Sequence, residues 1–198
     1  MGKTTLATAL ARETGAAVIP ELDATDAPPI AESAEWFVDA HAAQWRRARD
    51  LASRAPLVVI DGDPFKGLWF NWVFADQGWP DVQRQRHDEH LAAGTLAFPD
   101  LYVVLLATEE QLRARRADDP TRTRRNHDMH LRLIEPQRRY FEELRAVDPA
   151  RVLLIDTTAR RALIPAIVGA VRALPRDAPD SMRLFGHMFR WVTTHDPD

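Results

Sequence analysis

Short apolar runs, separated by longer amphipathic segments, divide the chain into regular elements. Leu57 to Asp61, apolar up to its last residue, and Leu101 to Leu106 are continuous runs, which is typical of strands buried in a parallel sheet. A shorter run, Ala16 to Ile19, and the segment Arg151 to Asp156 predict two further strands.

The segments between these runs show helical spacing. Within Ile30 to Arg54, Phe37, Ala40, Ala48 and Leu51 share one helical face, and arginines occupy the other. Strands therefore alternate with helices, which predicts a layered α/β fold with a parallel sheet. Further helices are predicted at Lys3 to Glu13, Asp81 to Ala93, Glu109 to Ala117, His127 to Val147 and Arg160 to Leu174, with Asp63 to Pro80 irregular and aromatic.

The last part of the chain carries a short amphipathic helix. Arg176 to Pro179 has the composition of a linker, so we divide the chain into a domain at residues 1–175 and a linker and helix at residues 176–198. One face of this helix is an apolar stripe, formed by Phe185, Met188, Phe189 and Val192 at spacings of i, i+3, i+4 and i+7. A stripe of this kind more often packs against its own domain than against a partner.

Composition limits the classes of function. The chain has 198 residues, a net charge of −3, 28% charged and 45% hydrophobic residues, so it is neither a polybasic nucleic-acid binder nor a disordered tail. It contains no cysteine, no apolar run near the ~20 residues of a membrane span and no visible signal peptide. We expect a cytoplasmic protein with no nucleic-acid or membrane partner, and both a monomer and a homodimer stay open.

The first residues carry the most specific motif. Gly2, Lys3, Thr4 and Thr5 match the second half of the phosphate-binding loop G-x-x-x-x-G-K-[ST], and a helical run follows. Backbone N–H groups at the start of a helix bind an anionic phosphate. Lys3 would reach the β- and γ-phosphates of ATP, and the Thr4 hydroxyl would bind Mg²⁺.

The use of lysine supports this interpretation. Lys3 and Lys66 are the only lysines among 26 basic residues, and the other 24 are arginine. A chain that otherwise uses arginine thus has a lysine where the phosphate loop needs one. The alternative is an ordinary amphipathic helix with an incidental lysine.

The first half of the motif and the strand that should precede it would lie before Met1. We expect that strand between the ones at Leu57 to Asp61 and Leu101 to Leu106, because each would otherwise lose a ladder of backbone partners, at roughly 1–3 kcal/mol per buried group. We therefore expect the 198-residue form to be truncated. The missing segment should hold four to six apolar, β-branched residues and then a glycine four residues before Met1.

In this order the elements resemble the P-loop nucleoside and nucleotide kinases, especially the thymidylate and deoxynucleoside kinases, up to about Leu174. The resemblance implies a kinase-type, three-layer P-loop fold whose first strand is missing, with ATP and Mg²⁺ as cofactors and a small-molecule phosphoryl acceptor. It rests on the phosphate loop, on strands ending in Val-Ile-Pro-Glu21 and Asp61-Gly62-Asp63, on Leu112-Arg113-Ala114-Arg115-Arg116 before an arginine-rich lid, and on a long helix ending in Tyr140-Phe141-Glu142-Glu143-Leu144.

Two departures concern the acceptor. The family carries an acidic residue followed by Arg after its third strand, and this chain has Asp61-Gly62-Asp63. Deoxynucleoside kinases place a Gln five residues after a Trp, whereas Trp36 is followed by His41 at that spacing. An acceptor that is not a nucleoside therefore stays open.

Three carboxylates are candidates for the chemistry. Asp61 ends a buried strand, where α/β sheets bind their ligands, and we assign it to Mg²⁺ or to the acceptor hydroxyl; the alternative is a cap of the next turn. By resemblance, Glu21 is the candidate base, and the alternative is a solvated loop residue. Asp63 is a weaker candidate.

The lid contains more arginines than one ion pair needs. Guanidinium groups bind phosphate oxygens in bidentate fashion, and a closing lid would bring two or three of them onto ATP. We favour Arg113, Arg122 and Arg125; the alternative for each is a solvated helix face.

Two further clusters have competing interpretations. His87 and His90 lie at i and i+3, but no further ligand stands at a suitable spacing, so a surface helix is favoured over a metal site. The aromatic residues from Trp69 to Trp79 either line an acceptor pocket or form a core under a long loop.

The sequence thus predicts an ATP-dependent small-molecule kinase, with nucleosides or nucleotides as the first candidate acceptors. An antibiotic or other metabolite hydroxyl is the alternative acceptor. A non-catalytic or regulatory nucleotide-binding domain is the alternative from another class.

Overall fold

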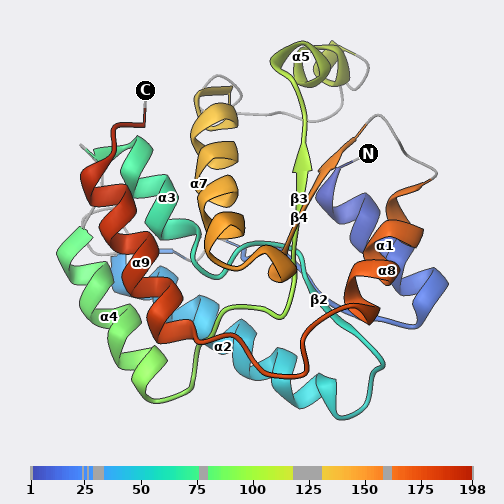
Figure 1. Cartoon of the computed structure of the whole chain (residues 1–198), viewed down its shortest axis with the longest axis horizontal. Helices are drawn as coiled ribbons and strands as arrows, with labels where there is room; N and C mark the ends of the chain where they lie inside the picture. Colours follow the sequence, from blue (N-terminus) through green and yellow to red (C-terminus); the bar gives the residue numbers. More distant parts are fainter. Residues whose placement is uncertain are drawn as a thin grey trace.

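A computed structural model of the chain describes residues 2–23, 25, 27–28, 34–75, 80–117, 131–157 and 162–197. The protein is α/β, with its strands in two small parallel sheets (Figure 1). None of the helices in these ranges is long and apolar enough to cross a membrane. The predicted α/β class and the parallel pairing of the strands are therefore confirmed.

The four strands within the described ranges form two pairs. β1 (Ala17–Ile19) pairs with β2 (Val58–Ile60), and β3 (Tyr102–Leu106) pairs with β4 (Val152–Asp156). All four lie within a residue of the predicted runs. The two strands expected to flank a further one, β2 and β3, belong to different sheets, and all three residues of β2 are only half-buried rather than buried.

Helices surround both sheets. They are α1 (Lys3–Thr14), α2 (Ala34–Ala52), α3 (Lys66–Val73), α4 (Pro80–Ala92), α5 (Glu109–Ala117), α7 (Ile134–Val147), α8 (Leu163–Arg172) and α9 (Ser181–Thr194), with a 3₁₀ turn, η3 (Pro149–Arg151), before β4. Figure 1 shows α1 and α8 on one side of β3 and β4, and α7, α3 and α9 on the other.

Alternation along β3 and β4 produces this layering, because successive side chains point to opposite faces of a sheet. Tyr102, Val104 and Val152 belong to the larger core, which α3, α4, α7 and α9 complete. Val103 and Leu153 pack instead against a smaller core. That smaller core is formed by Leu6 and Leu10 of α1 and Leu163 and Ile167 of α8.

The C-terminal helix α9 packs into the larger core. Its stripe residues Phe185, Met188, Phe189 and Val192 are all buried, so the preference for packing within the chain is confirmed. The segment before the helix is held by the buried guanidinium of Arg151, which donates to the backbone carbonyl oxygen of Asp177.

The prediction of irregular structure at residues 63–80 is wrong over residues 66–73, which form α3. Its side chains Leu68, Trp69 and Trp72 are buried in the larger core, between α4, α7 and α9. Trp69 and Trp72 therefore belong to the core, and Trp72 also lines a cavity with Leu68 and Phe185. Trp79 lies outside the described residues.

The surface position predicted for the His87–His90 helix is also wrong for His87, which is only 2% exposed. Its ring packs against the rings of Phe65 and Phe185, which also contact each other, because α4 is packed between α2, α3 and α9. His90 bonds Asp39 at 2.7 Å and Thr95 at 2.8 Å. Both histidines serve as packing and hydrogen-bonding residues between helices.

Candidate functional site

The start of α1 lies toward the end of the molecule where β3 terminates (Figure 1). Gly2 precedes the helix in an extended conformation (φ −96°, ψ 172°), and its carbonyl oxygen accepts the first helical hydrogen bond, from Leu6, at 3.0 Å. Within the described ranges no side chain caps this helix end. The amides of Lys3, Thr4 and Thr5 thus have no partner inside the helix and carry the positive end of its dipole.

The side chain of Thr4 connects this helix to the end of β2. Its hydroxyl donates a 2.6 Å hydrogen bond to Oδ2 of Asp61. Asp61 is 5% exposed, and its backbone amide donates to Ile19 of the neighbouring strand at 2.8 Å. The structure therefore brings together the two residues that the sequence assigned to Mg²⁺.

The other carboxylate oxygen of Asp61 is the more informative one. Oδ1 is buried and has no hydrogen-bond partner among the described residues. A buried oxygen without a partner costs free energy, about 1–3 kcal/mol for a neutral group and more for a charged one. A cap of the next turn would use that oxygen, so the arrangement favours a ligand at Asp61 over a purely structural role.

Mg²⁺ fits the oxygens present here. In nucleotide sites Mg²⁺ takes one or two protein oxygens and completes its shell with phosphates and water. The Thr4 hydroxyl and Oδ1 of Asp61 are oxygen donors of that kind. In the described ranges, this site included, no group of three or more His, Cys, Asp or Glu side chains could hold a metal ion by itself.

Lys3 and Glu21 lie at the same end of the sheet. The Lys3 ammonium is 3.7 Å from Oε2 of Glu21, and the two side chains are 58% and 50% exposed. An exposed pair of this kind adds little stability, typically 0–1 kcal/mol. Both groups are therefore accessible for binding as well as near each other. Thr5, in the first turn of α1, is exposed.

Asp63 has a different environment from Asp61. Its Oδ1 accepts hydrogen bonds from the Phe65 amide at 2.9 Å and the Tyr102 hydroxyl at 3.0 Å, and its Oδ2 accepts one from the Trp69 indole at 2.7 Å. Burial raises its pKa, and the three donors act against that rise. With its partners supplied by the protein, Asp63 joins the loop after β2 to α3 and β3.

Three residues at this end were not assigned to the site from the sequence. Gln44 of α2 donates to the carbonyl oxygen of Pro20 at 2.9 Å, and its Oε1 lies 3.1 Å from Nδ1 of His41. The backbone amide of Lys66, at the start of α3, donates to the carbonyl oxygen of Asp63 at 3.1 Å. Its ammonium makes no hydrogen bond or ion pair with the described residues and lies 5.8 Å from the Phe70 ring centroid. Burial lowers the pKa of Lys66 below its ordinary value, and the negative charge of Glu21 opposes that shift in part.

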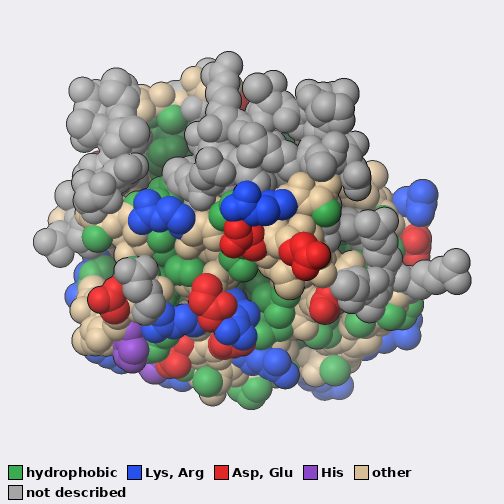
Figure 2. All heavy atoms as spheres, turned by 90° about the horizontal axis from the view of Figure 1, so that it is seen from above, with side chains coloured by type: hydrophobic (Ala, Val, Ile, Leu, Met, Phe, Trp, Pro, Cys, Tyr) green, Lys and Arg blue, Asp and Glu red, His purple; other side chains and the backbone are tan. Residues whose placement is uncertain are grey.

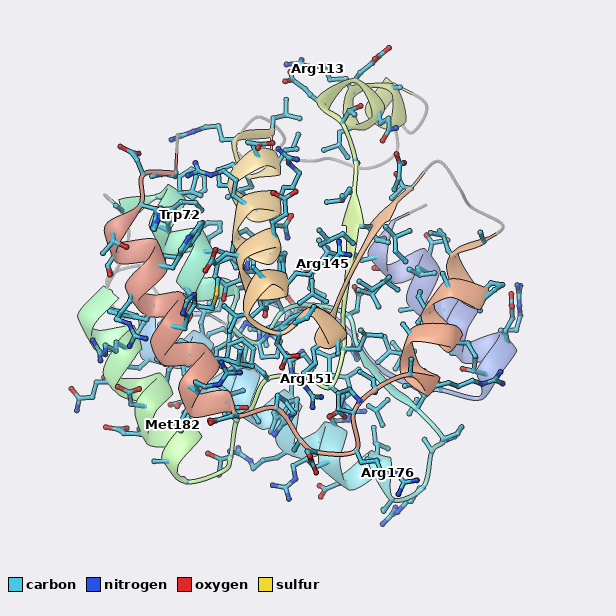
Figure 3. The ribbon with its side chains drawn as sticks, in the orientation of Figure 1. Trp72, Arg113, Arg145, Arg151, Arg176 and Met182 are labelled. Atoms are coloured by element: carbon cyan, nitrogen blue, oxygen red, sulfur yellow. The ribbon has the colours of Figure 1, made fainter. Side chains whose placement is uncertain are left out.

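The predicted lid is only partly described. Arg113 lies on α5, which stands at the top of the molecule, and its guanidinium bonds Glu109 one turn away (Figure 3). No described contact joins Arg113 to Lys3, Thr4 or Asp61. Arg122 and Arg125 lie outside the described residues, and their predicted role stays a prediction.

Figure 2 shows the surface of the molecule from above, at the end toward which β3 points. Basic and acidic side chains lie next to one another on this face, with hydrophobic side chains between them.

Comparison with known proteins adds no assignment. No protein-family model matches the chain, and no curated protein matches it. The candidate site is therefore assigned on its geometry and chemistry.

Proposed function

We propose that the chain is an ATP-dependent phosphotransferase that moves the γ-phosphoryl group of ATP to a small molecule. The 2.6 Å hydrogen bond between Thr4 and Asp61 carries this proposal. It joins a Gly-Lys-Thr-Thr helix start, the residue types that bind nucleotide phosphates, to a buried carboxylate with one unpartnered oxygen.

Each group has a role in this proposal. The free amides of the first turn of α1 and the Lys3 ammonium bind the phosphates of ATP. Thr4 and Asp61 hold Mg²⁺, which neutralises the charge that develops on the transferred phosphoryl group. Glu21, 3.7 Å from Lys3, has the proposed role of orienting the acceptor. Arg113, Arg122 and Arg125 belong to a lid that closes over the phosphates.

A kinase fold of the P-loop type and acceptors of the nucleoside or nucleotide class remain the first proposal. The α/β architecture and the meeting of the phosphate-binding helix with the end of β2 support it. Phosphoryl transfer asks the protein mainly for positioning and charge stabilisation, and this site supplies groups for both.

Two measurements on the full chain test the proposal. Calorimetric titration with ATP should show binding that strengthens with Mg²⁺, and ADP release should rise when nucleosides, nucleotides or other small hydroxyl compounds are added. Binding with slow hydrolysis that ignores every acceptor would mark a non-catalytic nucleotide-binding domain instead. Absence of ATP binding would contradict the whole assignment.

A further inference from the structure

The two ring nitrogens of His41 differ in their hydrogen-bond partners. Its Nδ1 lies 3.1 Å from Oε1 of Gln44, and Nε2 of Gln44 lies 2.9 Å from the carbonyl oxygen of Pro20. Because a carbonyl oxygen only accepts, Gln44 must turn its nitrogen to Pro20 and its oxygen to His41. Neutral His41 therefore carries its proton on Nδ1, and its Nε2 has a free lone pair with no partner among the described residues.

The surroundings keep this ring neutral. Burial lowers the pKa of His41, and the positive charge of Lys66 acts in the same direction. The hydrogen bond to Gln44 and the charges of Asp63 and Glu21 act against it without reversing the shift. His87 also interacts with the ring electrostatically. At neutral pH His41 is thus a hydrogen-bond acceptor and a base.

Gln44 holds the ring beside Pro20, the residue before Glu21, whose carboxylate lies 3.7 Å from the Lys3 ammonium. A base at this place serves one class of acceptor. An alcohol must lose its hydroxyl proton as it attacks phosphorus, whereas a phosphate monoester is already ionised at neutral pH and has no proton that a base must remove.

We infer that His41 receives the proton of an acceptor hydroxyl, so that the phosphoryl acceptor is an alcohol rather than a phosphate; this inference rests on the proposed phosphotransferase function. The hydroxyl proton moves to Nε2 of His41 as the acceptor oxygen bonds to the γ-phosphorus. The bond between that phosphorus and the bridging β–γ oxygen breaks, and ADP leaves with the electron pair. The imidazolium then releases its proton to water.

The tautomer can be measured without any acceptor. Long-range ¹H–¹⁵N spectra of the labelled full chain at pH 7 should show His41 neutral, with its proton on Nδ1. A charged ring, or a proton on Nε2, would overturn the inference.

Activity gives an independent test. ADP release is measured with ATP, Mg²⁺ and either a panel of alcohols (nucleosides, sugars and an aminoglycoside) or the corresponding monophosphates. The alcohols should stimulate it and the monophosphates should not. His41→Gln should lower the stimulated rate at least about 10²-fold with ATP affinity kept, the typical size of a general-base contribution. His187→Gln, which removes a histidine of α9 paired with Glu143, is the matched control and should keep the rate.

The pH profile separates a chemical role from a structural one. The wild-type rate should fall on the acid side as His41 becomes protonated, and the residual rate of His41→Gln should not follow that titration. Stimulation by monophosphates, or an unchanged His41→Gln rate, would overturn this inference alone. Lack of MgATP binding, or binding with no transfer to either panel, would overturn the proposed function as well.

Discussion

Thr4 and Asp61, 57 positions apart in the sequence, are joined by a hydrogen bond of 2.6 Å between their side chains. The contact connects the first turn of α1 to the end of β2, and α1 also packs against β1, the strand paired with β2. It leaves the second oxygen of Asp61 buried and unpartnered. A ligand that binds both side chains would therefore also bind this carboxylate oxygen, which accepts no hydrogen bond from the described residues.

Replacing Asp61 by Asn tests the charge at this position. The amide keeps the shape of the side chain but removes the negative charge that Mg²⁺ requires, so turnover should fall about 10²-fold or more with ATP binding largely retained. Steady-state ADP release and calorimetric titration measure the two effects. Retained turnover would make Asp61 a structural residue, and Glu21 would then be the better candidate for contact with the acceptor hydroxyl. Thr4→Ser, which keeps the hydroxyl, is the control and should lose much less activity than Thr4→Val.

Replacing Lys3 by Ala tests the phosphate-binding helix. Lys3 is 58% exposed and its only described ion pair, with Glu21, is weak, so the fold should survive. If the ammonium holds the β- and γ-phosphates, turnover should disappear while the circular dichroism spectrum stays the same. Arg12→Ala removes another exposed cation of the same helix and should leave turnover intact. Equal activities of the two variants would refute the assignment of Lys3.

The strands could be predicted from the sequence because each one leaves a simple pattern, a short run of apolar residues, although β2 is only half-buried. The helix α3 could not. Trp69 and Trp72 are buried and Phe70 half-buried, so the helix is apolar around most of its circumference and lacks the 3.6-residue alternation that a surface helix shows. Pro64 and Gly67 also have the composition of a loop.

Some residues of the candidate site could likewise be predicted from the sequence, and others could not. Lys3 and Thr4 belong to a local motif, and Asp61 marks the end of a strand, so short stretches of sequence sufficed to select them. His41, Lys66 and Tyr102 are not part of the phosphate loop or of a strand end, and packing between distant elements brings them close to Asp63. One signal was present and unused: Lys66 is the second of only two lysines.

Two buried tyrosines allow a matched test of the hydrogen bonds around Asp63. The Tyr102 hydroxyl donates to Asp63 at 3.0 Å, whereas the Tyr140 hydroxyl is buried with no partner among the described residues. Tyr102→Phe should lower the free energy of unfolding by about 1–3 kcal/mol, because Asp63 loses a donor. Tyr140→Phe should be neutral or stabilising, since it removes an unsatisfied group. Urea unfolding of both variants measures the difference, and equal effects would contradict the network described for Asp63.

Stability should depend on pH through His87. Burial lowers the pKa of His87 to about 4, while its Nδ1–H donates to the backbone carbonyl oxygen of Gln83. The ordinary histidine pKa is 6.5, so between pH 6.5 and pH 4 the unfolded chain binds a proton that the folded chain does not. The free energy of unfolding therefore falls as the pH is lowered through this range, by about 3 kcal/mol in total from this residue.

His87→Phe keeps a flat ring in the stack with Phe65 and Phe185 and removes the titrating group. Urea unfolding of the variant between pH 7 and pH 4.5 should show a shallower loss of stability than the wild type. A smaller slope should remain, because burial also lowers the pKa of His41. Parallel curves for the two proteins would mean that His87 is already protonated in the folded state, which its burial against two phenylalanine rings argues against.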